Sequence, residues 1–471
     1  MAQTQSAEWQ PPAGLLPKTF LHGYATASYQ VEGAHDKDGR GPSVWDDMCR
    51  VPGQIADGSS GDDACNSYYM TDVDVPLLKS LGVNAYRFSI SWSRLIPQGG
   101  KDDPINPAGI AYYNKLIDAL LAHGITPFVT LFHWDLPSGL EKRYRGWTSR
   151  NVLDDFQNYV RLCFKEFGDR VKNWITLNEP ICVVMFSSLG LKPDWDHEKD
   201  FYPIAHHLIL AHAQTVDIYR REFKPEQKGI IGITLNCDWC EPIDDSPAAK
   251  QAAQRRMDQS LGWYADPIYL GHYPKSIEDK APKFTEDEWK LIKGSSEFFG
   301  LNSYSTLYTN GESDPDDHLG GNTRAVRKKD GVHIGNEGHL EWLCDVPWGF
   351  GKLLAYINEK YMLPNDIPLI VTEQGFAVKN EHLKPLPELL KDTERIDYYR
   401  GYLKALTEAI SKGMRCDGYM AWSFIDNFEW KEGYIPAFGA VHVDRKNGEW
   451  TRTPKDSTKW LKSFWDRVVE A

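Results

Sequence analysis

Short apolar runs alternate with longer amphipathic stretches along most of the chain. The runs are a few residues long and rich in β-branched and aromatic residues, which is typical of buried strands. The pattern predicts eight strands, at Thr19–Ala27, Ala85–Trp92, Thr126–His133, Asn173–Asn178, Gly229–Asn236, Phe298–Tyr304, Pro368–Thr372 and Gly418–Phe424.

The stretches between the runs have apolar residues at helical spacing, and several begin near a Ser, Thr, Asp or Asn that could cap a helix. They predict helices at Ala108–His123, Val152–Phe167, Ala205–Phe223, Thr285–Lys293 and Ile396–Lys412. Eight alternations predict a single closed (β/α)8 barrel with long βα loops. An open doubly wound sheet is the alternative, but the first strand is followed by no Gly-rich phosphate loop.

No Pro/Gly/Ser-rich linker and no internal repeat divides the sequence. Residues 16–471 are therefore predicted to form one catalytic domain, preceded by a poorly ordered extension at residues 1–15. The stretch Asn310–Gly338, rich in Gly, Asp and Asn, is predicted to be a long surface loop near the site.

Composition excludes several classes of protein. The 471 residues include 53 basic and 66 acidic side chains, and a net charge of -13 would repel the phosphates of a nucleic acid. Met1–Leu15 lacks the pattern of a signal peptide, and no run of about eighteen apolar residues could span a bilayer. We therefore expect a cytoplasmic protein with no nucleic-acid or membrane partner.

Eight cysteines in a chain of this length are too sparse for a disulfide framework. Cys237 and Cys240 have the spacing of a redox motif but stand alone. Incidental thiols are the preferred interpretation, with metal or redox use as the alternative. No metal and no other cofactor are expected.

The chemistry is concentrated where the predicted strands end, and in a (β/α)8 barrel these ends share one rim. The residues there are Gln30, Arg87, His133, Asn178, Glu179, Asn302, Tyr304, Glu373, Trp422, Glu429 and Trp430. A lone glutamate at a strand end is more often a cap or an ion-pair partner. So many polar and aromatic groups at matched positions instead favour a sugar pocket, with Glu179 and Glu373 as the carboxyl pair that glycoside cleavage requires.

The motifs at these positions are highly specific together. They are Tyr29-Gln30-Val31-Glu32-Gly33, Tyr86-Arg87-Phe88-Ser89-Ile90-Ser91-Trp92-Ser93-Arg94, His133-Trp134-Asp135-Leu136-Pro137, Asn178-Glu179-Pro180, Thr372-Glu373 and Asp426-Asn427-Phe428-Glu429-Trp430. From about Leu16 to Val469 the chain resembles the family 1 glycoside hydrolases, and specifically the intracellular β-glucosidases of that family.

The resemblance implies a retaining β-glucosidase that acts on small-molecule β-glycosides, as a monomer or weak homo-oligomer. It implies that Glu373 is the nucleophile and Glu179 the acid/base. The implied neighbours of the nucleophile are Arg87 and Tyr304, the implied ligands of the glycone are Gln30, His133, Asn178, Trp422, Glu429 and Trp430, and the implied aglycone contacts are Trp342, Ile181 and Phe186.

Four departures from the family pattern concern the rate and the aglycone more than the reaction class. Gln374 stands where the family usually has Asn, Ala437 where Arg is common, and His22 where Trp is frequent; residues 189–203 lack the usual loop elements. Two alternatives stay open: a glycosidase that mainly transglycosylates, and a weakly active sugar-binding variant.

Overall fold

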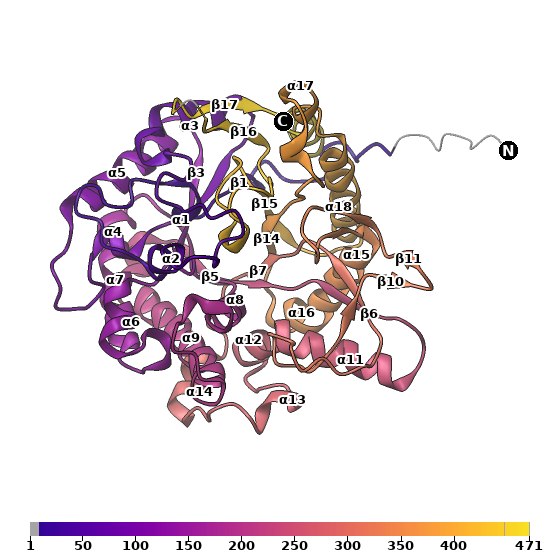
Figure 1. The fold of residues 1–471 in the computed structure, drawn as a ribbon, viewed down its shortest axis with the longest axis horizontal. Coiled ribbons are helices and arrows are strands. Elements are labelled where there is room, and N and C mark those ends of the chain that lie inside the picture. The colour runs from indigo at the N-terminus through magenta and orange to yellow at the C-terminus, as the bar shows by residue number, and fades with distance from the viewer. Residues whose placement is uncertain (1–8, 447, 471) are drawn as a thin grey trace.

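The structure is a computed structural model that describes residues 9–446 and 448–470. In this part of the chain, eight parallel strands close into a barrel (Figure 1). In order around the barrel they are β1 (Leu21–Ala25), β2 (Ala85–Ser89), β3 (Thr126–Phe132), β4 (Asn173–Asn178), β5 (Ile230–Asn236), β7 (Phe299–Asn302), β14 (Leu369–Gln374) and β15 (Cys416–Trp422). Each strand coincides with a predicted apolar run, so the prediction of a (β/α)8 barrel is confirmed.

Helices cover the outside of the barrel and alternate with its strands (Figure 1). The longer ones are α3 (Thr71–Ser80), α5 (Pro107–Ala122), α7 (Val152–Phe167), α9 (His197–Ile218), α11 (Pro247–Met257), α14 (Glu286–Ile292), α15 (Pro347–Ile357), α18 (Thr393–Ser411) and α19 (Asp456–Val468). The predicted helices are among them. However, α9 begins at His197 rather than at Ala205, because the side chain of Asp196 caps it and Pro203 is accommodated inside the helix.

Shorter helices lie mainly in the loops. They are α1 (Ser28–Val31), α2 (Val44–Cys49), α4 (Trp92–Leu95), α6 (Ser138–Tyr144), α8 (Pro180–Phe186), α10 (Lys224–Gln227), α12 (Trp263–Ala265), α13 (Lys275–Glu278), α16 (Leu363–Asn365) and α17 (Leu386–Leu389). Small sheets outside the barrel are formed by β6 (Trp239–Pro242) with β8 (Thr306–Thr309) and β9 (Ala325–Val326), β10 (Lys328–Lys329) with β11 (Val332–His333), β12 (Asn336–Glu337) with β13 (Cys344–Asp345), and β16 (Val441–Asp444) with β17 (Thr451–Pro454). The stretch predicted as one long surface loop therefore contains short paired strands.

The two strands that lead to the predicted carboxyl pair are irregular near their ends. On β14, Val371 and Glu373 pair with consecutive residues of β7, so β14 carries one extra residue at this point. Relative to β5, β4 likewise carries an extra residue between Ile175 and Asn178. Both irregularities are β-bulges, which are common next to active sites because they redirect the side chains that follow.

The described N-terminal residues pack against the last helix. Trp9 contacts Phe464 of α19 with ring centroids 6.3 Å apart, and the N–H of Gly14 donates to the carbonyl of Arg467 at 3.0 Å. Residues 1–8 of the predicted N-terminal extension lie outside the described residues. Among the described helices, none is both long and apolar enough to cross a membrane.

Candidate active site

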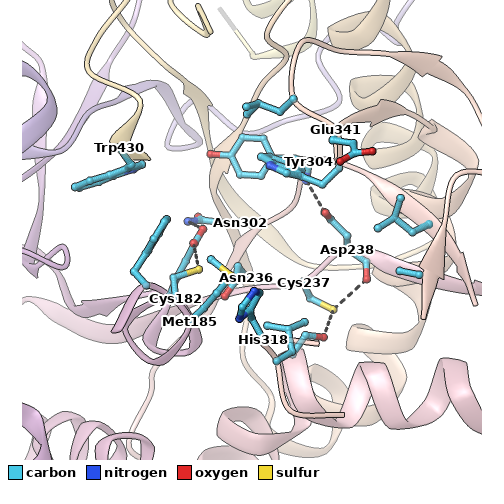
Figure 2. A pocket seen from close by; sticks show the side chains of 18 of the residues that line it. Cys182, Met185, Asn236, Cys237, Asp238, Asn302, Tyr304, His318, Glu341 and Trp430 are labelled. Carbon is cyan, nitrogen blue, oxygen red and sulfur yellow. Dashed lines mark hydrogen bonds between the residues drawn. The ribbon is translucent and has the colours of Figure 1, made fainter. Parts of the chain in front are cut away.

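A cavity of about 740 Å³ opens at the carboxyl ends of the barrel strands. Figure 2 shows Cys182, Asn302, Tyr304 and Trp430 around it. The predicted site residues that line it are His133, Glu179, Phe186, Tyr304, Trp342, Glu373, Trp422, Glu429 and Trp430. Gln30, Arg87 and Asn178 are fully buried behind this wall.

Glu373 is a buried carboxylate with a donor on each oxygen. Nη1 of Arg87 donates to Oε1 at 2.6 Å, and the hydroxyl of Tyr304 donates to Oε2 at 2.6 Å. Burial raises the pKa of Glu373, whereas Arg87 and Tyr304 oppose the rise because they favour the charged form. The two donors therefore stabilise the ionised form of Glu373.

Glu179 lies in a different environment. It follows β4 in the left-handed conformation, with φ of 42°, and its carboxyl group folds back over the start of α8. Its Oε1 accepts from Nδ2 of Asn302 at 2.6 Å, and its Oε2 lies 3.0 Å from the thiol of Cys182. Burial, together with repulsion from Glu373, raises the pKa of Glu179 to about 8. This carboxyl group consequently holds a proton at neutral pH.

A chain of hydrogen bonds connects Arg87 to the imidazole in the cavity wall. Nη2 of Arg87 donates to Oδ1 of Asn178 at 2.6 Å, and Nδ2 of Asn178 lies 3.0 Å from Nε2 of His133. Burial, with a smaller contribution from Arg87, lowers the pKa of His133 well below its usual value. The imidazole is therefore neutral, so Nε2 accepts from Asn178 and Nδ1 carries the proton.

Glu429 adds a third carboxyl group to the same cavity. Burial and repulsion from Glu373 and Glu179 raise the pKa of Glu429 to about 8. Gln30 fixes this loop, because its amide donates to the carbonyl of Phe428 at 2.8 Å. Three neighbouring carboxyl groups thus share one pocket, and the donors around them favour ionisation of Glu373.

Aromatic rings form the rest of the wall. The ring of Trp422 is stacked on the imidazole of His133, with centroids 6.0 Å apart, and Trp430 packs against Trp134 at 4.6 Å. At the mouth, Trp342 is 41% exposed and contacts the ring of Tyr304 edge to face. These flat apolar faces suit the C–H faces of a sugar ring.

The entrance differs from the sequence prediction at one position. Ile181 does not line the cavity and is buried in the core. The residues that do line it on this side are Cys182, Met185, Phe186 and Leu189. This spacing is that of one helix face, and Ile181 lies out of phase with it because the left-handed Glu179 sets where α8 begins.

Three residues that depart from the family pattern, Gln374, Ala437 and His22, are buried. Nε2 of Gln374 donates to the carbonyl of Ser303 at 3.2 Å, but its Oε1 is buried without a hydrogen-bond partner. The carbonyl of Ala437 accepts from the buried Arg395 at 2.8 Å, so a cation from α18 reaches the loop that lacks its usual arginine. His22 is buried against Trp465.

Ion pairs hold the unusual stretch at residues 189–203. Lys192 is buried and its Nζ lies 2.5 Å from Oε1 of Glu141. Arg145 pairs with Asp200 at 2.9 Å and also with Asp194. This segment is therefore tied to the short helix α6 and the turn that follows it, and Leu189 at its start lines the cavity.

The sequence analysis assigned no role to several residues that the structure brings into the site. They are Cys182, which contacts Glu179; Thr372, which contacts Asn302; Trp134, whose indole N–H donates to the carbonyl of Asn178; and Asp238, which accepts from the backbone N–H of Tyr304. Asn302, which the sequence analysis placed on the rim, lines the cavity and donates to Glu179. Cys182 could have been found from its spacing, since residues three apart at a helix start are neighbours.

Cys237 and Cys240 are free thiols that line the same cavity. They are buried, as are the other cysteines except Cys49. Within residues 9–446 and 448–470, no group of three or more His, Cys, Asp or Glu side chains could hold a metal ion.

Comparison with known proteins gives a consistent result. Residues 13–468 match the model of glycosyl hydrolase family 1. The chain is 46% identical over 478 residues to beta-glucosidase 1B of Phanerodontia chrysosporium, covering 98% of this chain and 87% of that protein. The structure of beta-glucosidase 2 from Trichoderma reesei in complex with Tris has a TM-score of 0.92 and 45% identity, covering 97% of this chain and 100% of that one.

A family 1 beta-glucosidase from Humicola insolens, solved in complex with glucose, has a TM-score of 0.92 and 42% identity, covering 98% of this chain and 100% of that one. The family model and these relatives span nearly the whole barrel, including both strands that lead to the carboxyl pair. The chain therefore belongs to glycosyl hydrolase family 1 and is a glycoside-hydrolysing enzyme.

Proposed function

We propose that the protein is a retaining β-glucosidase that removes terminal non-reducing β-D-glucosyl residues from cellobiose and from aryl or alkyl β-glucosides. The observation that carries this proposal is the contrast between two neighbouring carboxyl groups. Glu373 has a cationic donor and a phenolic donor, whereas the pKa of Glu179 is raised to about 8. One group is prepared as a nucleophile and the other as an acid.

In the first step, Glu373 attacks the anomeric carbon while Glu179 donates its proton to the departing oxygen. The bond from the anomeric carbon to the aglycone breaks, a glycosyl ester of Glu373 forms, and the aglycone leaves as a neutral alcohol. Arg87 and Tyr304 orient the attacking carboxylate, because each of its oxygens is fixed by a short hydrogen bond.

In the second step, water attacks the anomeric carbon, the bond from this carbon to the oxygen of Glu373 breaks, and Glu179 accepts a proton from the water. Esterification removes the negative charge of Glu373, and this charge is the second cause of the raised pKa of Glu179. The pKa of Glu179 therefore falls when the intermediate forms, and the same group changes from acid to base.

The cavity wall supports a glucosyl unit without a phosphate. Glu429 adds a carboxyl group that can accept from two hydroxyls, and a phosphate would bring negative charge beside three carboxyl groups. The imidazole of His133 in the wall is neutral, and Trp422 offers a flat face to the ring. Trp342 at the mouth provides a platform for the aglycone.

The test replaces the nucleophile. We expect Glu373→Ala to lose hydrolysis of an aryl β-glucoside and to regain turnover with added azide, which enters the space of the missing carboxylate and gives α-glucosyl azide. Product anomers are followed by NMR. Rescue that gives the β-azide would refute the assignment of Glu373.

Glu179→Gln is the companion variant. Protonation by a general acid contributes about 10²–10⁴-fold, so cleavage of cellobiose should fall much more than cleavage of a dinitrophenyl glucoside, whose phenolate leaves without a proton. Equal losses would remove Glu179 from the role of acid. In the unmodified enzyme, aglycone release that exceeds glucose release would support the transglycosylating alternative, and binding of glucose without any turnover would support the sugar-binding alternative.

A further inference from the structure

The two oxygens of Glu179 have unequal partners. Oε1 accepts a short hydrogen bond of 2.6 Å from the amide of Asn302, whereas Oε2 faces the thiol of Cys182 at 3.0 Å. An amide is a good donor and a thiol is a weak donor and a weak acceptor. The identity of the oxygen that carries the transferable proton therefore depends on whether the orientation of Asn302 is fixed.

Two buried threonines fix this orientation. The hydroxyl of Thr372 donates to Oδ1 of Asn302 at 2.7 Å and itself lies 3.1 Å from the hydroxyl of Thr234. With Oδ1 engaged, Nδ2 of Asn302 faces Glu179. Nδ2 of Asn302 also donates to Oδ1 of Asn178 at 3.1 Å, an oxygen that accepts from Arg87. An exchange of the amide oxygen and nitrogen of Asn302 would place its oxygen against this acceptor.

Oε1 consequently always faces an N–H donor, and a proton on the same side of Oε1 would collide with it. The acid form of Glu179 therefore carries its proton on Oε2, the oxygen beside Cys182. In the carboxylate form, Oε2 needs a donor instead. A thiol is compatible with both forms of Glu179. It can donate weakly to the carboxylate, and its sulfur can accept weakly from the O–H group of the acid.

We propose that Cys182 is a positioning residue for the acid/base glutamate. Its thiol contacts Oε2 of Glu179, the oxygen that carries the proton, and thereby sets the relative stability of the acid and carboxylate forms of Glu179. The proposal rests on the proposed function of Glu179 as acid/base. Cys182 itself stays protonated, since burial and the neighbouring Glu179 raise the pKa of its thiol well above the usual value.

The backbone makes this contact a fixed part of the fold. The N–H of Cys182 donates to the carbonyl of Glu179 at 2.9 Å in the first turn of α8, so the two side chains start from one helical turn. Cys237 provides a matched control. It is also buried in the cavity wall, but its thiol contacts Met257 and Ser260 rather than a catalytic carboxyl group.

The experiment measures kcat/KM against pH on a nitrophenyl glucoside for the unmodified enzyme, Cys182→Ser, Cys182→Ala and Cys237→Ser. The upper limb of this profile reports the essential acid of the free enzyme. A serine hydroxyl is a stronger donor to the carboxylate, so Cys182→Ser should lower the upper limb, whereas Cys182→Ala removes the donor and should raise it. Each shift is expected to be about half a pH unit or more, and Cys237→Ser should leave the limb in place.

Glu179→Gln separates the two proposals. If its residual activity keeps the descending limb, the limb does not belong to Glu179 and the proposed function fails. Suppose instead that Glu179→Gln loses the descending limb, and that the Cys182 variants have their descending limb at the same pH as the unmodified enzyme. The assignment of Cys182 is then wrong, while the function of Glu179 stands. Where Cys182→Ala does not fold, the nearly isosteric Cys182→Ser decides alone, and an unmoved or raised limb would overturn the proposal.

Discussion

Replacing Tyr304 with Phe removes one hydroxyl from the site and leaves its surroundings in place. The lost contact is the 2.6 Å hydrogen bond to Oε2 of Glu373. The other contacts of Tyr304 use its backbone or its ring: its N–H donates to Asp238, and its ring packs against Trp342 and Phe438. Phe retains all of these contacts, so the change tests the hydroxyl alone.

The expected magnitude follows from the charge of the acceptor. A hydrogen bond to a charged group contributes about 1.5–3 kcal/mol, and about 1.4 kcal/mol corresponds to one pKa unit. Arg87 remains on Oε1 of Glu373 and still favours the ionised form, which limits the change. We therefore expect the pKa of Glu373 to rise by about one unit.

The nucleophile must be ionised, so a higher pKa moves the lower limb of kcat/KM toward higher pH. The assay is the pH dependence of kcat/KM on a nitrophenyl glucoside. Tyr144→Phe is a matched control, because its hydroxyl also donates to a carboxylate at 2.6 Å, that of Asp155, away from the cavity. A lower limb that stays in place in Tyr304→Phe, or moves equally in both variants, would refute the reasoning.

Three further predictions concern the surrounding structure. Burial raises the pKa of Asp426, but Lys455, His442 and Arg395 together outweigh burial and hold the pKa well below the usual range. The stabilisation is therefore present above the unfolded pKa of about 3.9 and lost as pH falls through the folded value. Asp426→Asn should lower the free energy of unfolding in urea by about 3–5 kcal/mol at pH 7, and a difference from the unmodified enzyme that does not narrow in acid would contradict this. Gln374→Asn should raise kcat and leave KM nearly unchanged, since it shortens by one methylene a side chain whose buried amide oxygen has no partner beside the nucleophile. An unchanged or lower kcat would show that glutamine is neutral. Trp342→Ala should raise KM for aryl glucosides about fivefold, from the loss of about 1 kcal/mol of ring packing, with kcat nearly constant, and a fall confined to kcat would place Trp342 elsewhere in the mechanism.

Local pattern carried most of the fold prediction. The barrel strands are buried on both faces, so they stand out as continuous apolar runs, and each run ends where a loop begins. That position placed Glu373, Arg87 and Tyr304 on one rim before any contact was known. Arg87 and Tyr304, which the family resemblance implied as neighbours of the nucleophile, both contact Glu373.

The parts that sequence did not predict depend on helix phase and on contacts between distant segments. Ile181 was placed at the entrance, but the phase of α8 follows from the left-handed backbone at Glu179, which no apolar pattern shows. Nor could local pattern predict that Arg395 reaches the carbonyl of Ala437 or that Lys192 pairs with Glu141. These contacts join segments far apart in the sequence.

The extra residues on β4 and β14 have a consequence for how the enzyme tolerates changes of length. Side chains of a regular strand alternate between its two faces, so each bulge resets this alternation just before a reactive glutamate. Thr372 and Glu373 both face the barrel interior, since Thr372 contacts Asn302 and Glu373 contacts Arg87. Deleting Thr372 would remove the contact that holds Asn302 and change the path of the strand that carries Glu373, although every catalytic side chain would still be present in the sequence. The chemistry of this barrel thus depends on the number of residues in two strands as well as on their identity.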